Sequence, residues 1–538
     1  MKADAFTAER IGLDWLRTAV APVGAFGRRH DATIAPYGPG DEARAHTEIG
    51  EVVALAERLE RDDVPGLRAA LRAVPEPGPI VSRARAGDTL TDVDLYELGR
   101  FADALTALAR AWDSAGGAAD RRPPEPAGLR EILAPGRDGA SFYLADAFAA
   151  QLPAARAALA AAEADYEARR EAIAARVRDA IGIDAAGDEF VVLRDVYDGP
   201  LPDDVLLVRE TPTYRAATVR VVAPERDAAL ARLATAEDEA RRALTERIAR
   251  EADAIAAATR ALGALDRLLA RVAFTQRWGG CAPQLAGDAI AFSDATFAPL
   301  AEALAARGRR YTPLSLELRG VAVLTGPNMG GKSAALAGAG FVAACVALGV
   351  PPPARAASLP LVDAVAWIGG EGREDRARLL SSYAAEVLRG RDALANATGR
   401  TLVLVDEFAR TTGPREGRAL LIAFAESIRD RGAWGLVATH FDGVAEAAGV
   451  RHLRIAGLRR ELPERIGDGD LNAALDAIDA AMDYRIVEAD AHAESSDALE
   501  LARLLGIPEP VMRRARALYE RGTDAPSAAP PSTAAPSS

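Results

Sequence analysis

Short continuous apolar runs stand out in the second half of the chain, at residues 321–324, 402–405 and 435–438. Each run is followed by glycine or polar residues, and longer polar stretches separate the runs. Runs of this length are typical of strands that are buried on both faces of a parallel sheet. We therefore expect an α/β fold from about residue 281, with a mostly parallel sheet and flanking helices.

A different pattern precedes this region. Residues 143–180 and 225–272 are rich in alanine and in charged residues, which is typical of helices. The second stretch carries apolar residues at coiled-coil-like spacing: Leu244, Ile248, Ile255, Leu262, Leu265 and Leu269. As one continuous helix it would span roughly 70 Å at about 1.5 Å per residue.

Between the two helical stretches, the chain switches to β-like apolar runs within residues 188–224. This order predicts an antiparallel helical arm, residues 121–280, with a small β-rich tip. Residues 1–120 contain short amphipathic segments joined by Pro/Gly turns, so we expect an all-α core or lever domain there. The α/β domain should occupy residues 281–520, followed by a disordered Ala/Pro/Ser tail at residues 521–538.

Composition points to a cytoplasmic globular protein. The chain has 538 residues, of which 49% are hydrophobic, and its two cysteines, Cys281 and Cys345, cannot build a disulfide framework. No run of about 18 apolar residues suggests a membrane span, and the N-terminus has no signal-peptide core. The net charge of −13 lowers the expectation that nucleic acid is the main partner. A local basic stripe could still exist in a chain with this net charge.

The only internal lysine, Lys332, lies in a G-x-x-x-x-G-K-S segment that directly follows the first apolar run. This is the spacing of the phosphate-binding loop of nucleotide triphosphatases. Backbone N–H groups of such a loop surround phosphate oxygens, the lysine contacts the β- and γ-phosphates, and Ser333 offers its hydroxyl to Mg²⁺. The loop residues predicted to bind ATP are Gly326, Pro327, Asn328, Met329, Gly330, Gly331, Lys332 and Ser333.

Candidate catalytic and metal-binding residues follow two further predicted strands. Asp406 and Glu407 end the second apolar run, where the aspartate would hold Mg²⁺ with Ser333 and the glutamate would orient the attacking water. His440 follows the third run and would contact the γ-phosphate or its water; a simple polar strand cap is the alternative. Arg410 would either stabilise γ-phosphate charge or form a surface ion pair.

These motifs resemble the ATPase of the MutS family. The family pattern after the acidic pair is D-E-[aliphatic/aromatic]-G-R-G-T-[ST]-x-x-[DE]-G, and residues 406–417 read DEFARTTGPREG. The matching residues are Asp406, Glu407, Arg410, Thr412, Glu416 and Gly417, whereas Ala409, Thr411 and Gly413 depart from the pattern. Residues 438–441, ATHF, also resemble the family.

The resemblance implies a homodimer, or a heterodimer with a paralogous MutS-like subunit, that binds ATP and Mg²⁺. Residues 381–386 resemble the family segment that completes the nucleotide site of the other subunit, so Ser382 and Glu386 would act there. Residues from about 494 to 520 resemble a helix-turn-helix dimerisation element. Residues 212–277 resemble the returning helix of the family's lever and clamp. Phe292 or Phe297 would stack on adenine, with core packing as the alternative.

Two classes of client remain open. The resemblance favours DNA of non-mismatch type, held between the arms of a dimer. Residues 188–224, however, contain seven acidic residues and four arginines, the reverse of what a phosphate-binding tip needs. The variant sequence of residues 410–417 resembles the MutS-related reactivating factors of cobalamin-dependent lysine aminomutases, which makes a protein client the alternative.

Mismatch recognition itself is not expected. The sequence Phe-x-Glu, which senses mispairs in the family, occurs here only at residues 424–426 inside the α/β domain. We expect too few residues before the arm for the N-terminal domain that recognises mismatches in the family. We also expect no nuclease-like Smr domain, which one branch of the family carries, after the ATPase. A binding titration at stated salt should therefore show equal affinity for mispaired and fully paired duplexes; a preference for the mispair would contradict this reading.

Overall fold

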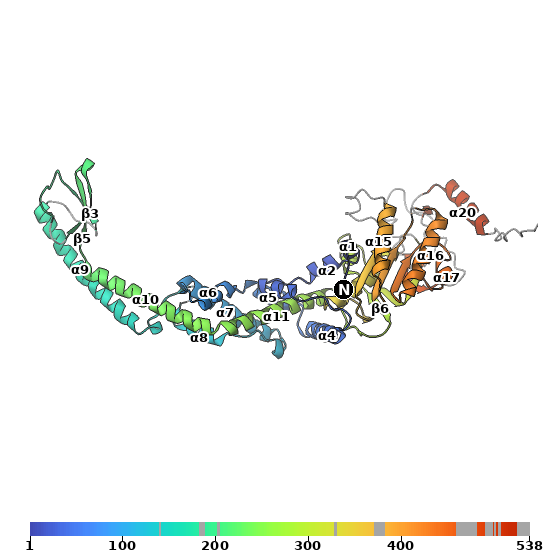
Figure 1. Cartoon of the computed structure of the whole chain (residues 1–538), viewed down its shortest axis with the longest axis horizontal. Helices are drawn as coiled ribbons and strands as arrows, with labels where there is room; N and C mark the ends of the chain where they lie inside the picture. The colour runs from blue at the N-terminus through green and yellow to red at the C-terminus, as the bar shows by residue number, and fades with distance from the viewer. Residues whose placement is uncertain are drawn as a thin grey trace, which may run out of the picture.

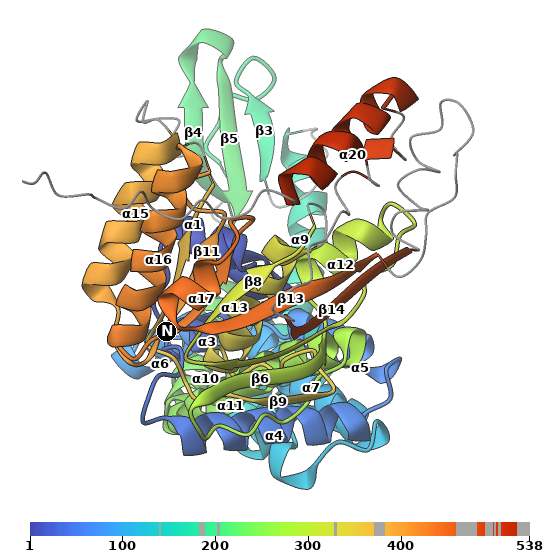
Figure 2. The same cartoon turned by 90° about the vertical axis from the view of Figure 1, so that its right-hand side faces the viewer.

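The computed structural model describes the chain except for residues 139–140, 182–188, 202–204, 328–330, 371–381, 411, 459–480, 490–498, 500–501, 504–506 and 524–538. The molecule is long and curved, with an α/β unit at one end and a small sheet at the other (Figure 1). Seen from the α/β end, the helical part lies behind the sheet (Figure 2). No described helix is long and apolar enough to cross a membrane.

The α/β unit is built on a six-stranded sheet in the order β10-β11-β12-β8-β13-β14. Neighbouring strands are parallel except for the β13–β14 pair. Its strands are β8 (Val321–Thr325), β10 (Ala364–Ile368), β11 (Thr401–Asp406), β12 (Trp434–Ala438), β13 (Arg451–Leu458) and β14 (Met482–Glu488). The three apolar runs of the sequence coincide with β8, β11 and β12, so the α/β prediction is confirmed. The antiparallel β14 was not predicted.

Side chains alternate between the two faces of this sheet. Ala322 and Leu324 pack in one core cluster with α13 (Lys332–Ala347). Val321 and Val323 pack in another cluster, to which α16 (Pro414–Asp430) and α17 (Val444–Ala448) contribute. Helix α15 (Ser382–Asn396) lies against β10. The strands read as fully apolar because helices cover both faces.

A second, antiparallel sheet lies beside α13 and was not anticipated from the sequence. It has the order β7-β6-β9, formed by β6 (Ala289–Ala295), β7 (Leu314–Arg319) and β9 (Ala356–Ser358), with α12 (Ala298–Ala305) between β6 and β7. Phe292 and Phe297, the candidate adenine contacts, lie in this region. Phe292 is buried in the core, and Phe297 packs edge-on against Phe341.

The N-terminal part is helical. Its helices are α1 (Ala5–Arg10), α2 (Leu13–Ala19), α3 (Ala25–Ala32), α4 (Glu42–Arg58), α5 (Asp63–Ala73), α6 (Gly78–Ala86), α7 (Asp92–Ser114) and α8 (Ala127–Leu133). Most of them share one apolar core with the long helix α11, in which Phe101 and Trp112 are fully buried. The first residues instead join the α/β unit, because the Lys2 N–H donates to Asp363 O at 2.7 Å and the Val365 N–H donates to Lys2 O at 2.9 Å.

Three long helices carry the chain out and back: α9 (Gln151–Ile181), α10 (Pro224–Arg250) and α11 (Ala252–Trp278). Pro153 does not interrupt α9 because it lies in the first turn, where its missing N–H has no helical partner. The single helix predicted over residues 225–272 is wrong. It breaks at Glu251, where the N–H donates to Ile248 O three residues back and tightens the turn without glycine or proline.

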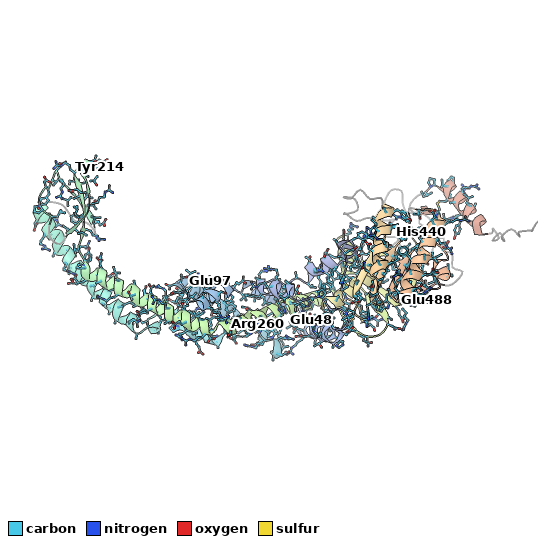
Figure 3. The ribbon with its side chains drawn as sticks, viewed as in Figure 1. Glu48, Glu97, Tyr214, Arg260, His440 and Glu488 are labelled. Atoms are coloured by element: carbon cyan, nitrogen blue, oxygen red, sulfur yellow. The ribbon has the colours of Figure 1, made fainter. Side chains whose placement is uncertain are left out.

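At the far end of α9 and α10 lies a three-stranded antiparallel sheet in the order β3-β5-β4. Its strands are β3 (Glu189–Leu193), β4 (Val205–Thr211) and β5 (Ala216–Val221). One face packs on Tyr166 of α9 through Phe190, Val192, Val205, Ala217 and Val219. We call this sheet the tip; Figure 3 labels Tyr214 there. The remaining short elements among the described residues are β1 (Arg137–Asp138), β2 (Ser141–Phe142) and four 3₁₀ turns, and the last described helix is α20 (Glu509–Thr523).

A buried guanidinium joins the helical part to the α/β unit. Arg271 of α11 donates to the carbonyl of Leu348, at the end of α13, from Nε at 3.3 Å and from Nη2 at 3.1 Å. Its Nη2 also donates to Asp31 at 3.2 Å, and the neighbouring Arg267 bonds Asp31 and Glu48. Burial lowers the pKa of Arg271 to about 10. The guanidinium therefore keeps its charge at neutral pH.

Replacing Arg271 by leucine should lower the free energy of unfolding by roughly 3 kcal/mol, because it removes one partner of a buried ion pair and leaves Leu348 O without its donor. A urea titration followed by tryptophan fluorescence measures the change. Arg260→Leu is the matched control, because Arg260 lies exposed on the same helix and should change stability by less than about 0.5 kcal/mol. Equal shifts in the two variants would contradict the structural role of Arg271.

Candidate nucleotide-binding site

The predicted site residues meet where parallel strands end. The carboxyl ends of β8, β11 and β12 lie side by side, and ligands of α/β sheets bind at such an edge. A cavity of about 690 Å³ opens there. It is lined by Pro327, Gly331, Lys332, Ser333, Ala334, Gly370, Glu386, Asp406, Glu407, Arg410 and His440.

The phosphate loop runs from β8 to the start of α13. Gly326 and Gly331 have φ of +148° and +90°, a region that other residues enter only with strain. At Gly326 a Cβ would also lie 2.9 Å from Cβ of Ile455, so glycine is needed on two counts. Helix α13 begins at Lys332, and Lys332, Ser333 and Ala334 of its first turn line the cavity, as at other helix N-termini that bind phosphate. Asn328, Met329 and Gly330 lie outside the described residues.

Lys332 is buried, with 6% of its surface exposed. Its Nζ donates to Gly326 O at 2.8 Å and to Pro327 O at 3.3 Å, and it lies 3.6 Å from Oε1 of Glu407. Burial lowers the pKa of Lys332, and the charge of Glu407 opposes this shift. The ammonium is therefore held beside the loop by its own carbonyls, in position to contact phosphate oxygens.

Ser333 and Asp406 form the candidate metal site. The Ser333 hydroxyl donates to Oδ1 of Asp406 at 3.0 Å. Burial raises the pKa of Asp406, while the Ser333 hydrogen bond lowers it. Among the described residues no group of three or more His, Cys, Asp or Glu side chains forms a metal cluster. Mg²⁺ does not require one, because it commonly uses one or two protein oxygens with phosphate and water, so this pair fits Mg²⁺.

Glu407 reaches the cavity through an unusual backbone. Its φ is +49°, and its N–H donates to Ala438 O of β12 at 3.0 Å. The two carboxylate oxygens lie 3.6 Å from Lys332 Nζ and 3.6 Å from Arg410 Nη1. A left-handed conformation in glutamate costs roughly 1–2 kcal/mol, and such strain is concentrated at functional sites.

The sequence is similar to those of known proteins. The model of MutS domain V matches residues 322–521. The DNA mismatch repair protein MutS of Anaeromyxobacter sp. (strain K) is 28% identical over 547 residues, which cover 94% of this chain and 57% of that protein. Endonuclease MutS2 of Anaeromyxobacter sp. (strain Fw109-5) is 34% identical over 218 residues, 40% of this chain and 25% of that protein.

Residues 322–521 therefore form a MutS domain V, and the chain is similar to MutS proteins along most of its length. It spans little more than half the length of the MutS relative that it matches along most of its own length. It is also similar to the DNA mismatch repair protein MutS of Thermus thermophilus, with 31% identity over 285 residues, 52% of this chain and 32% of that protein.

The structure explains how the chain tolerates one departure from the MutS pattern. Ala409 stands where the family pattern has glycine, and its φ is +61°. The left-handed backbone explains why glycine suits this position. Ala409 retains the conformation because its N–H donates to Oε2 of Glu386 at 3.1 Å. Thr411, another departure, lies outside the described residues.

Glu386 has a role within its own chain. It is 5% exposed, and its second oxygen accepts the Gly370 N–H at 3.3 Å. Burial raises the pKa of this carboxyl group, and the two backbone hydrogen bonds lower it. Both oxygens thus fix the loops that follow β10 and β11. The contact expected with a second subunit stays a prediction, as it does for Ser382, whose side chain lies outside the described part of α15.

His440 and Arg410 complete the cavity rim. His440 lies two residues after the end of β12, is exposed, and lies against Phe441 with ring centroids 4.4 Å apart (Figure 3). The preceding Thr439 is buried, and its N–H donates to Leu324 O at 3.1 Å, which fixes the chain direction here. Arg410 is exposed and faces Glu407. Phe292 and Phe297 do not line this cavity.

Sequence reasoning missed the part played by residues 369–370. Gly369 has a φ of +114°, and a Cβ there would lie 2.0 Å from Asp406 O. The loop after β10 can therefore pass next to the acidic pair only with glycine. A Gly-Gly pair directly after an apolar run was the available signal, because close backbone approach commonly needs glycine at a strand end.

Proposed function

We propose that this chain is a Mg²⁺-dependent ATPase that works as a dimeric switch of the MutS type and clamps DNA of non-mismatch type. The observation that carries the proposal is the convergence of Lys332, the Ser333–Asp406 pair and Glu407 in one cavity. MutS family members are ATPases of this domain type, which supports hydrolysis here. The alternative, a passive nucleotide site, would not need a carboxylate held beside the lysine at a strained backbone position.

Each residue would have a separate task in hydrolysis. Lys332 would bind β- and γ-phosphate oxygens, and Ser333 with Asp406 would hold Mg²⁺, which supplies charge neutralisation when bound. Glu407 would orient the attacking water and accept its proton. His440 at the rim would contact the γ-phosphate or its water, and Arg410 would compensate charge on Glu407 and the phosphate. The backbone N–H groups of the loop, which Pro327 lacks, would surround the phosphates.

The path from the site to the arms supports a switch. Helix α13 starts at Lys332 and ends next to the Leu348 carbonyl that Arg271 binds. Arg271 belongs to α11, which continues through Glu251 into α10 and so to the tip. A shift of α13 on ATP binding would therefore move the helix that carries the arm. We propose residues 1–120 as the lever, 121–280 as the arm and 281–520 as the ATPase.

Dimerisation would use the C-terminal region. Helix α20 presents large apolar side chains to solvent: Val511 is 55% exposed and Leu518 is 52% exposed, and they lie on one helix face seven residues apart. Ile507, just before the helix, is 44% exposed. Such a stripe supports the proposed contact with a second copy or a paralogous subunit.

A protein client is the second candidate, and the tip is the observation that favours it. Arg194 pairs with Glu210 at 3.2 Å, and Arg215 pairs with Asp195 at 2.9 Å, so these cations are neutralised locally. The tip also exposes large apolar side chains instead of burying them. They include Val191 at 49%, Leu193 at 46%, Leu206 at 53% and Tyr214 at 75%. Such a surface suits an apolar protein face, for example on a cobalamin-dependent aminomutase, better than phosphate.

Glu407→Gln should bind ATP with unchanged affinity and lose turnover by roughly 100-fold or more, because the amide keeps the shape but cannot accept a proton. Fluorescent-nucleotide binding and phosphate release measure the two properties. Glu317→Gln is the matched control, since Glu317 is exposed on β7 and does not line the cavity. Hydrolysis at the wild-type rate in Glu407→Gln would overturn the assignment.

The DNA function predicts that a random-sequence duplex binds more tightly with ATP, and that Arg209→Gln with Arg220→Gln lowers the slope of log affinity against log salt by about 1 per arginine that contacts phosphate. Fluorescence anisotropy over a salt series measures this. Val191→Ser with Leu206→Ser should leave the slope unchanged, because these side chains carry no charge. Absence of duplex binding in both nucleotide states would reject the DNA function and favour the protein client.

A further inference from the structure

A cavity of about 420 Å³ lies between α5 and the end of α11, away from the nucleotide site. It is lined by Val23, Arg61, Val64, Pro65, Arg68, Ala69, Arg72, Ala273, Gln276 and Arg277. Four of these side chains are arginines, and none of the lining residues is acidic. In a chain with a net charge of −13, four arginines around one cavity need a physical explanation.

Structural contacts account for two of the four arginines. Arg61 donates to Gln276 O near the end of α11, where a cation also offsets the helix dipole. Arg277 pairs with Glu302 of α12 and lies over the Trp278 ring at 5.0 Å. These contacts would hold both side chains in place whether or not the cavity binds a ligand.

Arg68 and Arg72 are not accounted for in this way. Arg68 donates from Nη2 to Ala21 O at 3.1 Å, but its Nε is buried and has no hydrogen-bond partner in the described structure. Arg72, one helical turn further on, is exposed and makes neither an ion pair nor a hydrogen bond with the described residues. Like charges one turn apart on a helix repel each other, so the pair destabilises α5 unless an anion joins them.

The carboxylate that attracts Arg68 is already engaged in hydrogen bonds. Asp266 of α11 attracts Arg68, but its carboxylate oxygens accept the N–H groups of Val23 and Gly24 at 3.1 and 2.7 Å. Burial lowers the pKa of Arg68; the charge of Asp266 opposes this shift, and the charge of Arg72 adds to it. Asp266 thus offsets part of the charge of Arg68, whereas no acidic residue lines the cavity itself.

We propose that this cavity is a second anion site, in which Arg68 and Arg72 bind a phosphate group. Guanidinium groups bind phosphate oxygens through paired N–H donors, and the exposed guanidinium of Arg72 has its donors unused among the described residues. The volume suffices for a phosphate with an organic body packed on Val64 and Pro65. Two sources share this chemistry: a free phosphate compound, or a backbone phosphate of nucleic acid, since α5 lies on the concave side of the molecule (Figure 1).

This anion site would be coupled mechanically to the proposed nucleotide switch, although its ligand could bind without ATP. A ligand bound by α5 and lying against the last turn of α11, which lines the other side of the cavity, would fix these two helices next to the α/β unit, since Arg277 already contacts α12. This part of α11 also carries Arg271. A bound phosphate would therefore stiffen the same joint that the nucleotide is proposed to move, and the two sites would be coupled through α11.

Isothermal titration with inorganic pyrophosphate tests the first source. Wild-type chain should bind at two sites, because the phosphate loop also binds pyrophosphate. Arg68→Gln with Arg72→Gln should lose one site or weaken it at least roughly tenfold, while Lys332→Ala should lose the other. Arg260→Gln, on an exposed part of α11, is the control and should keep both sites.

A short random-sequence duplex tests the second source. If the ligand is backbone phosphate, the double variant should lower the salt slope of duplex binding by about 2, and pyrophosphate binding need not change. If the ligand is a free compound, only pyrophosphate binding should change. Unchanged results in both titrations, or equal losses in Arg260→Gln, would overturn the proposal.

Arg72→Gln alone distinguishes ligand binding from a structural role. Since Arg72 has no partner in the described structure, its removal relieves repulsion with Arg68, and the melting temperature without ligand should stay unchanged or rise. Added pyrophosphate should then raise the melting temperature less than in wild type. A lower melting temperature without ligand would show that Arg72 serves the fold and would contradict the proposal.

Discussion

The contact between Arg271 and the carbonyl of Leu348 joins the two halves of this molecule. Helix α13 has 16 residues and runs from the phosphate loop to this contact, so the two ends of one rigid element lie in the nucleotide cavity and in the helical joint. The guanidinium is buried and shared with Asp31. Because breaking a buried ion pair is costly, the joint transmits a displacement better than a solvated contact would.

The nucleotide cavity depends on a second constraint, the crowding of backbone at the carboxyl edge of the sheet. Glu407 and Ala409 both have positive φ, and the Gly369 backbone lies against that of Asp406. Glu386 holds these loops together by accepting one N–H from each. The arrangement of this side of the cavity therefore depends on two loops and one buried carboxylate, and it would be lost if either loop moved separately.

The sequence predicted those parts in which local pattern and tertiary structure agree. Strands β8, β11 and β12 are apolar throughout, and the lone internal lysine, the acidic pair and His440 each follow such a strand, so their meeting could be foreseen. The sheet of β6, β7 and β9 was missed because its strands alternate and are separated by a helix and a long connection. The break at Glu251 has no local signal, since the turn is made by ordinary helix-forming residues.

The ion pairs could not be predicted from the sequence either. The excess of acidic residues in residues 188–224 already suggested a surface unsuited to phosphate. The structure adds that Arg194 and Arg215 pair with carboxylates, and that the outer face of the tip sheet is apolar. Conversely, the arginines in and around α5 do not form a sequence motif that would predict a binding site. Arg61, Arg68, Arg72 and Arg277 converge only because α5 packs against the end of α11. Long-range packing, and not local propensity, decides both surfaces.

The most direct test of the proposed coupling is the distance between the two tips of a dimer. Spin labels at Tyr214→Cys, in a Cys281→Ser background, would report it by pulsed electron resonance with and without ATP in the Glu407→Gln chain; Cys345 is fully buried. The account predicts that ATP shifts the distance distribution, and that Arg271→Lys, which keeps the charge but loses the forked donor, abolishes the shift. Identical distributions with and without ATP, or a shift that survives without Arg271, would contradict it.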